Sequence, residues 1–227
     1  MEILIIVPAR AGSVGIKNKN FVKIYGKHLI EYTLDFIKET KLKNVLISSD
    51  SQKILNLCKL KGFSTEYLRP KNISKSNTSM YTTVNHAIEW LKKKNKNFDT
   101  LLLLQPSNPL RKLKTLKQMI SKMKSKNYNS VVSVTKMREH PSECIEIKSN
   151  NQWKYLTRNN DYSRRQEFID NFYFIDGDFF LINIKLLKKF KKFIIPKHTC
   201  FVKADKLWPV DIDYPDDLKV FRSFLKK

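Results

Sequence analysis

A loop rich in small and cationic residues follows the first apolar run of the chain. The segment at residues 2–7, which is apolar from Ile3 onward, predicts a buried strand. Small residues after such a strand let backbone N–H groups approach phosphate oxygens, and cations neutralise the charge of a polyphosphate. The segment contains neither a GxxxxGK(S/T) nor a GxGxxG pattern, so it predicts phosphate binding of another type, with a plain tight turn as the alternative. Its polar and small residues are Arg10, Gly12, Ser13, Gly15, Lys17, Lys19 and Asn20.

A pair of carboxylates stands near the other end of the chain. Asp211 and Asp213 are two residues apart in an expected strand end at 210–213, so both side chains should point to one face. Two like charges held so close repel each other unless a cation lies between them, and paired hard oxygens suit Mg²⁺. Asp216 and Asp217 follow Pro215, where acids in the first turn of a helix are favoured by its dipole.

The elements that must position these residues alternate between short strands and amphipathic helices. This order predicts a mainly parallel sheet with helices on both faces. Thr78 or Ser79 is expected to cap the third helix. Strands are expected at 2–7, 44–48, 65–68, 100–104 and 130–134, and helices at 29–40, 51–61, after 79, and around Leu116, Met119, Ile120 and Met123.

Residues 136–175 break this rhythm, because they are polar and aromatic without a helical period, and 152–156 predicts a hairpin strand. The alternation returns with an expected strand at 178–183 and helices at 185–190 and 215–225. We therefore predict one α/β domain over residues 1–227, built in three layers, with a protruding element inserted at about 136–175.

The net charge of +23 suggests nucleic-acid binding at first. However, 36 of the 44 cationic residues are Lys, dispersed among many Asn and Ile, as AT-rich codon usage also produces. The clusters at 92–96 and 188–192 are interpreted as solvated faces, so we expect no specific nucleic-acid partner. The few arginines are more informative, since guanidinium supplies a fixed bidentate fork; five of them are Arg10, Arg69, Arg111, Arg164 and Arg165.

The cysteines and the hydropathy indicate the compartment. Cys58, Cys144 and Cys200 stand far apart without a CxxC pair, which favours reduced thiols over a zinc site or a disulfide scaffold. No run of 18 uncharged apolar residues and no signal peptide are found, so we expect a cytoplasmic protein without membrane insertion.

Six ordered motifs resemble the acylneuraminate cytidylyltransferases, the family of the CMP-sialic acid synthetases. The resemblance spans nearly the whole chain. It rests on residues 7–20 (VPARAGSVGIKNKN), 68–70 (LRP) with 77–79 (NTS), His86-Ala87, 103–111 (LLQPSNPLR), Arg165-Gln166 with Asp176-Gly177, and 210–218 (VDIDYPDDL).

The resemblance implies a role for each matching residue. Arg10 and Lys19 match cations that hold the CTP phosphates, and Asp211 and Asp213 match the pair that binds Mg²⁺. The remaining matches line the nucleotide site at Ser13, Asn20, Arg69, Thr78 and Ser79, and the sugar site at Gln105, Arg165, Gln166 and Phe180.

A reaction and partners follow from the same resemblance. The fold implied is a Rossmann-like nucleotidyltransferase, and the reaction joins CTP and a nonulosonic, sialic-acid-like sugar to give a CMP-sugar and pyrophosphate for surface polysaccharide. The segment at 136–175 is then a dimerisation element of a homodimer. Val14, at a position where the family carries Lys, and Glu143, at a position where some relatives carry a basic sugar contact, leave the exact sugar and full activity open.

Two other classes of function stay open at this point. The first is a cytidylyltransferase for an eight-carbon ulosonic acid, against which Lys19-Asn20 and the segment 104–111 favour the sialate side. The second is a catalytically weak paralogue or a basic nucleic-acid-binding protein, which would need clustered cations with aromatic stacking residues.

Overall fold

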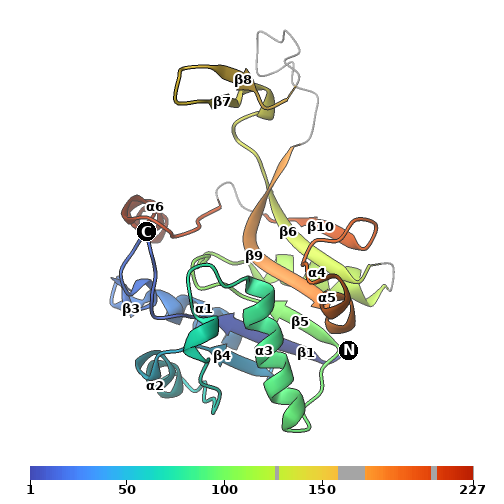
Figure 1. Cartoon of the computed structure of the whole chain (residues 1–227). Helices are drawn as coiled ribbons and strands as arrows, with labels where there is room; N and C mark the ends of the chain where they lie inside the picture. Colours follow the sequence, from blue (N-terminus) through green and yellow to red (C-terminus); the bar gives the residue numbers. More distant parts are fainter. Residues whose placement is uncertain (126–127, 158–171, 206–208, 227) are drawn as a thin grey trace.

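The computed structural model describes residues 1–125, 128–157, 172–205 and 209–226, and shows a body from which an arm projects (Figure 1). A six-stranded sheet in the order β10-β6-β9-β5-β1-β4 forms the centre of the body. β1 runs parallel to both β4 and β5, and β10 runs parallel to β6, while β9 is antiparallel to β5 and β6. The mainly parallel sheet is thus confirmed. Its strands are β1 (Ile3–Pro8), β4 (Val45–Ser48), β5 (Thr100–Leu103), β6 (Ser130–Lys136), β9 (Tyr173–Asn183) and β10 (Thr199–Lys203).

Helices cover both faces of this sheet, because each presents an apolar stripe at helical spacing. On one face, α1 (Leu29–Thr40), α2 (Gln52–Leu60) and α4 (Leu113–Lys124) bury side chains in one cluster with Ile5 and Leu102. On the other face, α3 (Met80–Lys93) and α5 (Ile184–Phe190) pack against Leu4 and Leu101. The alternation of side chains along each strand supplies both clusters, and the expected three layers are confirmed.

A third apolar cluster fixes the C-terminal segment. Phe221 of α6 (Pro215–Leu225) packs with Ile212 and with Leu29 at the start of α1. The carboxylate of Asp217 accepts hydrogen bonds from the N–H groups of residues 213 and 214, at 2.9 and 2.7 Å. The first turn of α6 therefore holds the chain next to the expected acidic pair in one position.

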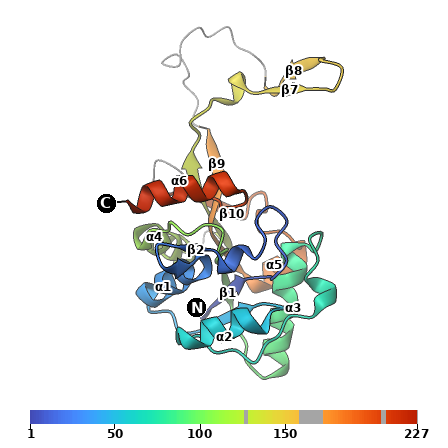
Figure 2. The ribbon, with the colours of Figure 1, turned by 90° about the vertical axis from the view of Figure 1, so that its left-hand side faces the viewer.

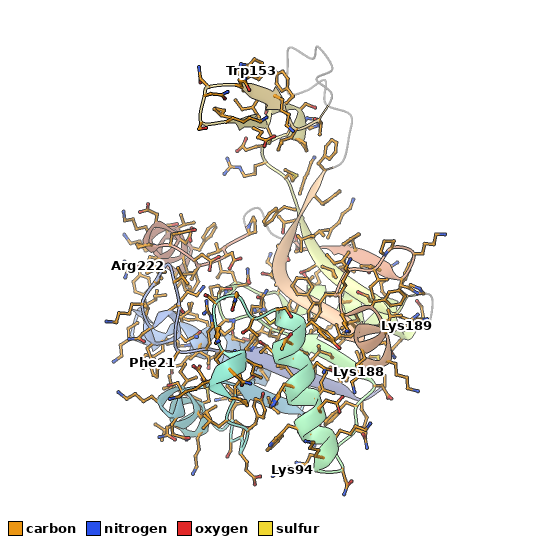
Figure 3. The ribbon with its side chains drawn as sticks, viewed as in Figure 1. Phe21, Lys94, Trp153, Lys188, Lys189 and Arg222 are labelled. Carbon is orange, nitrogen blue, oxygen red and sulfur yellow. The ribbon has the colours of Figure 1, made fainter. Side chains whose placement is uncertain are left out.

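The arm consists of the ends of β6 and β9 and a small hairpin beyond them. β6 and β9 stay paired as far as Lys136 and Tyr173. Beyond this point β7 (Ile145–Ile147) pairs antiparallel with β8 (Trp153–Tyr155), which confirms the hairpin strand expected at 152–156. Figure 2 shows the same hairpin standing clear of the body from the side, and Figure 3 shows Trp153 on this hairpin.

Two expected strands are wrong, and some pairings were not foreseen. At 65–68 only a single parallel bridge joins Ser49 and Leu68. Residues 210–213 join no strand ladder, because the neighbouring chain is a loop whose Ser107 carbonyl accepts the Ile212 N–H at 2.8 Å. The unforeseen pairings are β10 and the short hairpin of β2 (Lys23–Ile24) with β3 (Lys27–His28).

The lysine clusters at 92–96 and 188–192 lie close together on the face of the sheet that α3 and α5 cover, since Glu89 interacts with Lys92, Lys93 and Lys188. Lys94 stands at the far end of α3, Lys188 and Lys189 lie on α5, and Arg222 projects from α6 on another side (Figure 3). Lys188 pairs with Glu89 at 2.6 Å, so part of this charge is neutralised locally. Within the described ranges, none of the helices combines the length and the apolar character needed to cross a bilayer.

Candidate active site

A cavity of about 430 Å³ opens at the carboxyl ends of β1 and β5. β4 and β5 lie on opposite sides of β1, so the chain changes direction across the sheet at this point. Crevices at such switch points are where open α/β sheets bind ligands. The cavity brings together most of the predicted site residues, which come from distant segments: Arg10, Ser13, Lys19, Asn20, Arg69, Thr78, Gln105, Asp211 and Asp213.

Hydrogen bonds hold the loop after β1 in its curved path. The N–H of Ala11 donates to the Asp50 carboxylate at 2.8 Å, and the buried Asn20 amide donates to the Arg10 carbonyl at 3.0 Å. Gly15 lies so close to the C-terminal segment that a Cβ on it would stand 2.2 Å from the Asp213 carbonyl oxygen. Asn20 therefore supports the loop that carries Arg10, and Gly15 permits the loop to meet the acidic segment.

The two predicted carboxylates line the same cavity. Ile212 between them is buried, so Asp211 and Asp213 face the opposite way, as the spacing predicts, although their partner is a loop and not a strand. The surrounding protein desolvates the Asp211 carboxyl and so raises its pKa, although the side chain remains exposed to water. A hydrogen bond from the Ser107 hydroxyl lowers this pKa, and the negative charge of Asp213 raises it. The charge of Lys19 lowers this pKa and so offsets part of the effect of Asp213.

Lys19 lies directly on this acidic segment. Its Nζ donates to Asp213 Oδ1 at 2.7 Å and to the Ile212 carbonyl at 2.6 Å. The Lys19 side chain is 15% exposed, against 61% for Asp213. The structure thus joins the predicted phosphate-binding cation to the predicted metal-binding carboxylate by an ion pair.

Arg69 is a buried cation in the cavity wall. Its guanidinium donates to the Ser48 hydroxyl at 3.0 Å and to the Ser48 carbonyl, just past the bridge that follows β4. Burial lowers its pKa, Asp50 and Tyr67 raise it, and the nearby charge of Arg10 lowers it further. Arg69 and Arg10 thus concentrate positive charge on one side of the cavity.

Supports behind Gln105 were not predicted from the sequence. The partly buried Arg111 guanidinium donates to the Gln105 carbonyl, to Thr33 Oγ1 at 3.0 Å and to the Asp178 carbonyl at 2.9 Å. Burial lowers its pKa to about 10, against the raising effect of Asp178 and Asp176. Arg111 orients the turn after β5, and its place in the segment 103–111 was the only sequence signal for this role.

Other predicted site residues do not line the cavity. Ser79 caps α3 by accepting the Thr82 N–H at 3.0 Å. Phe180 is in β9, opposite Leu103, and packs edge-on against Phe193 with ring centroids 5.6 Å apart. Arg165 and Gln166, with the neighbouring Arg164, lie outside the described residues.

Several cavity residues were not among the predicted site residues, although Val14 had been noted at a position where the family carries Lys. Lys75 and Ser76 reach the cavity from the turn before α3, and Tyr214 reaches it next to Asp213. Val14, 82% exposed, also lines it without adding charge. The sequence carries no signal for Lys75, because an exposed lysine in a lysine-rich chain looks like any other.

Comparisons with known proteins agree with this arrangement. The family model described as cytidylyltransferase matches residues 4–214. The chain is 27% identical over 227 residues to the pseudaminic acid cytidylyltransferase of Campylobacter jejuni, covering 100% of this chain and 97% of that protein. It is 32% identical over 150 residues to the CMP-N,N'-diacetyllegionaminic acid synthase of Legionella pneumophila, covering 66% of this chain and 64% of that one.

A solved structure shares the fold. The CMP:2-keto-3-deoxy-manno-octonic acid synthetase complexed with CTP superposes with a TM-score of 0.70 at 15% identity, covering 99% of this chain and 98% of that chain. The Rossmann-like α/β nucleotidyltransferase fold is thereby confirmed. The chain therefore belongs to the cytidylyltransferase family, and it is a nucleotidyltransferase of the acylneuraminate cytidylyltransferase type.

Proposed function

We propose that the chain transfers CMP from CTP to a nonulosonic acid in the course of surface polysaccharide synthesis. The observation that carries the proposal is the single cavity that gathers a cationic loop, a buried arginine and a carboxylate pair from segments about 200 residues apart in the chain. Relatives whose names specify pseudaminic acid as the acceptor and a CMP-legionaminic acid as the product support this class of sugar.

The cavity residues divide naturally between the two ends of the reaction. The anomeric hydroxyl oxygen of the sugar would attack the α-phosphorus of CTP, and the bond to the pyrophosphate oxygen would break. Arg10 and Lys19 supply positive charge where the pyrophosphate departs, and preorganised charge of this kind stabilises the transition state most. Arg69, which donates a hydrogen bond to the Ser48 hydroxyl and lines the same cavity, would bind the nucleotide.

The carboxylate pair fits a Mg²⁺ ion, which would neutralise phosphate charge and orient the triphosphate when bound. Within the residues that the structure describes, no three His, Cys, Asp or Glu side chains converge, so no complete protein cage for a metal is present. Mg²⁺ does not need one, since it keeps water molecules and takes oxygens from substrate phosphates. Desolvation and, to a smaller extent, the charge of Asp213 raise the pKa of Asp211, and a cation bound to both carboxylates would offset their repulsion.

The arm is the surface on which we expect a second copy of the chain. Ile147 is 62% exposed and Trp153 is 58% exposed, and both lie on the β7–β8 hairpin. Exposed apolar side chains gathered in one element mark an interaction surface. The proposed homodimer and the cytoplasmic location both follow the expectations drawn from the sequence.

The test is pyrophosphate release by the purified full chain with CTP and Mg²⁺. N-acetylneuraminate, pseudaminate and legionaminate are compared with an eight-carbon ulosonic acid and with each other nucleoside triphosphate. We expect turnover with CTP and at least one nine-carbon acid. Turnover with the eight-carbon acid alone would transfer the proposal to that sugar class, and no turnover with any acid would refute it.

A further inference from the structure

One ion pair links the cationic loop after β1 to the carboxylate pair at Asp211 and Asp213. Lys19 Nζ contacts Asp213 Oδ1 and the Ile212 carbonyl oxygen, at 2.7 and 2.6 Å. Both acceptor atoms are hard oxygens. A divalent cation would bind the same carboxylate oxygen of Asp213. An ammonium group and a divalent cation are therefore rivals for the same carboxylate.

The geometry points to an exchange at Asp213: we propose that Lys19 competes with the divalent cation for this carboxylate, and that the nucleotide triphosphate draws Lys19 away. The metal would then bind the carboxylate pair strongly only together with the nucleotide. This inference rests on the proposed function for the identity of the two ligands, but the competition itself concerns only Lys19, Asp213 and a divalent cation.

Lys19 is suited to such an exchange. A lysine ammonium has three donors at the end of a flexible stem, so it can move between carboxylate and phosphate oxygens without losing its hydrogen bonds. Arg69 is buried and bound to Ser48, and burial leaves it no comparable freedom. Lys19 also comes from the loop whose backbone meets the Asp213 segment at Gly15, so a small movement of its side chain suffices.

Two ligands that share one competitor bind with positive coupling. If Lys19 must leave Asp213 before the metal binds, any anion that holds Lys19 elsewhere raises the affinity for the metal. By linkage, the metal then raises the affinity for that anion by the same factor. Removing the ammonium should abolish this part of the coupling and strengthen metal binding in the absence of nucleotide.

The experiment is a Mn²⁺ titration of the full chain without nucleotide, followed by the paramagnetic resonance signal of free Mn²⁺. It compares the wild type with Lys19→Met and with Lys75→Met. Lys75 lines the same cavity, so its removal corrects for the loss of one positive charge there. We expect Lys19→Met to bind Mn²⁺ about tenfold more tightly than Lys75→Met, as the loss of one adjacent competing charge implies. Equal affinity in the two variants would overturn the inference.

A measurement on the wild type removes dependence on the folding of the variants. Lys19 should react slowly with an amine-acylating reagent, because its side chain is only 15% exposed and is bound to Asp213. Added Mg²⁺ should raise the acylation of Lys19, measured by peptide mass spectrometry, and leave that of Lys75 unchanged. Unchanged acylation of Lys19 at saturating Mg²⁺ would contradict the exchange.

The two proposals can fail separately. Turnover of a nonulosonic acid by the wild type, together with equal Mn²⁺ affinity in both variants, would refute the exchange and leave the function standing. Tighter Mn²⁺ binding in Lys19→Met, without turnover of any acid by the wild type, would refute the function and keep the exchange.

Discussion

The cavity and the arm differ in which side chains are held in place and which are exposed. Around the cavity, polar side chains are held by buried or partly buried partners, as Arg69 is by Ser48 and as the Gln105 turn is by Arg111. On the arm, Ile147 and Trp153 are more than half exposed, and no buried cluster among the described residues includes β7 or β8. A region with fixed polar groups is prepared for chemistry, whereas one with exposed apolar groups is prepared for contact.

This difference separates the effects expected from substitutions. In the cavity, removing a functional group should damage activity more than it damages stability, because positions that crowd like charges are strained in the folded state. On the arm, removing an apolar side chain should leave the fold intact and change association, because the chain alone buries little of it.

The largest effect is expected at the carboxylate pair. Asp211→Asn should lower turnover by at least about a hundredfold, comparable to the loss of one preorganised electrostatic group. The folded state raises the pKa of Asp211, so folding favours its protonated form and the ionised form costs stability once the pH exceeds the unfolded pKa. Asn removes this cost, so the melting temperature at pH 7 should be equal to that of the wild type or higher.

Asp216→Asn is the matched control for this prediction. Asp216 is exposed on the first turn of α6 and pairs with Lys219 at 2.7 Å, away from the cavity lining. Its replacement should leave steady-state turnover within about twofold and thermal unfolding almost unchanged, since surface pairs contribute little. Near-normal Mg²⁺-dependent turnover in Asp211→Asn would break the contrast between cavity and surface.

The next effect concerns how the sugar is held. A nonulosonic acid carries a carboxylate beside its anomeric centre, and planar bidentate recognition of that group calls for guanidinium. Arg165→Lys should raise the KM for the sugar and lower kcat/KM by about ten- to a hundredfold, or roughly 1.5–3 kcal/mol, while leaving CTP binding nearly unchanged. Equal damage to the CTP affinity in binding assays would assign Arg165 to the phosphates or to the fold, and no effect would favour Arg164.

A smaller effect should follow from crowding the loop. In Gly15→Ala the new Cβ would meet the Asp213 carbonyl oxygen at 2.2 Å, so the loop or the acidic segment must shift. We expect kcat/KM for CTP to fall by about tenfold, because small displacements of catalytic groups are costly. Gly12→Ala is the control in the same loop, since its Cβ would meet nothing within 4 Å. Equal kinetics in the two variants would show that Gly15 is merely a turn residue.

The two regions also differ in what the sequence predicts. The bounds of α1 and α6 were predicted to the residue, because apolar spacing and a local signal such as Pro215 define a helix. The strands at 65–68 and 210–213 failed because a strand needs a partner along its length, which the local sequence does not specify. Most of the residues predicted from sequence motifs line one cavity, as expected. The positions of Lys75 and Tyr214 and the hydrogen bonds from Arg111 were not predicted, because they depend on how distant segments pack.

The smallest effect on the fold is expected from substitutions on the arm. Ile147→Lys with Trp153→Lys places two charges on the exposed face of the β7–β8 hairpin. We expect the variant to sediment as a monomer where the wild type sediments as a dimer, because buried unpaired charge at an interface opposes association.

Under the same substitutions the body should barely respond. Both side chains are already more than half exposed in the single chain, so the free energy of unfolding of the monomer should change by about 0.5 kcal/mol or less. Lys148→Glu, on the same hairpin but polar already, serves as the control and should leave sedimentation unchanged. A double variant that remains dimeric would locate the interface elsewhere. A monomeric double variant whose melting temperature is several degrees lower would show that the arm contributes to the core of the fold. The arm and the cavity would then not differ in the way described.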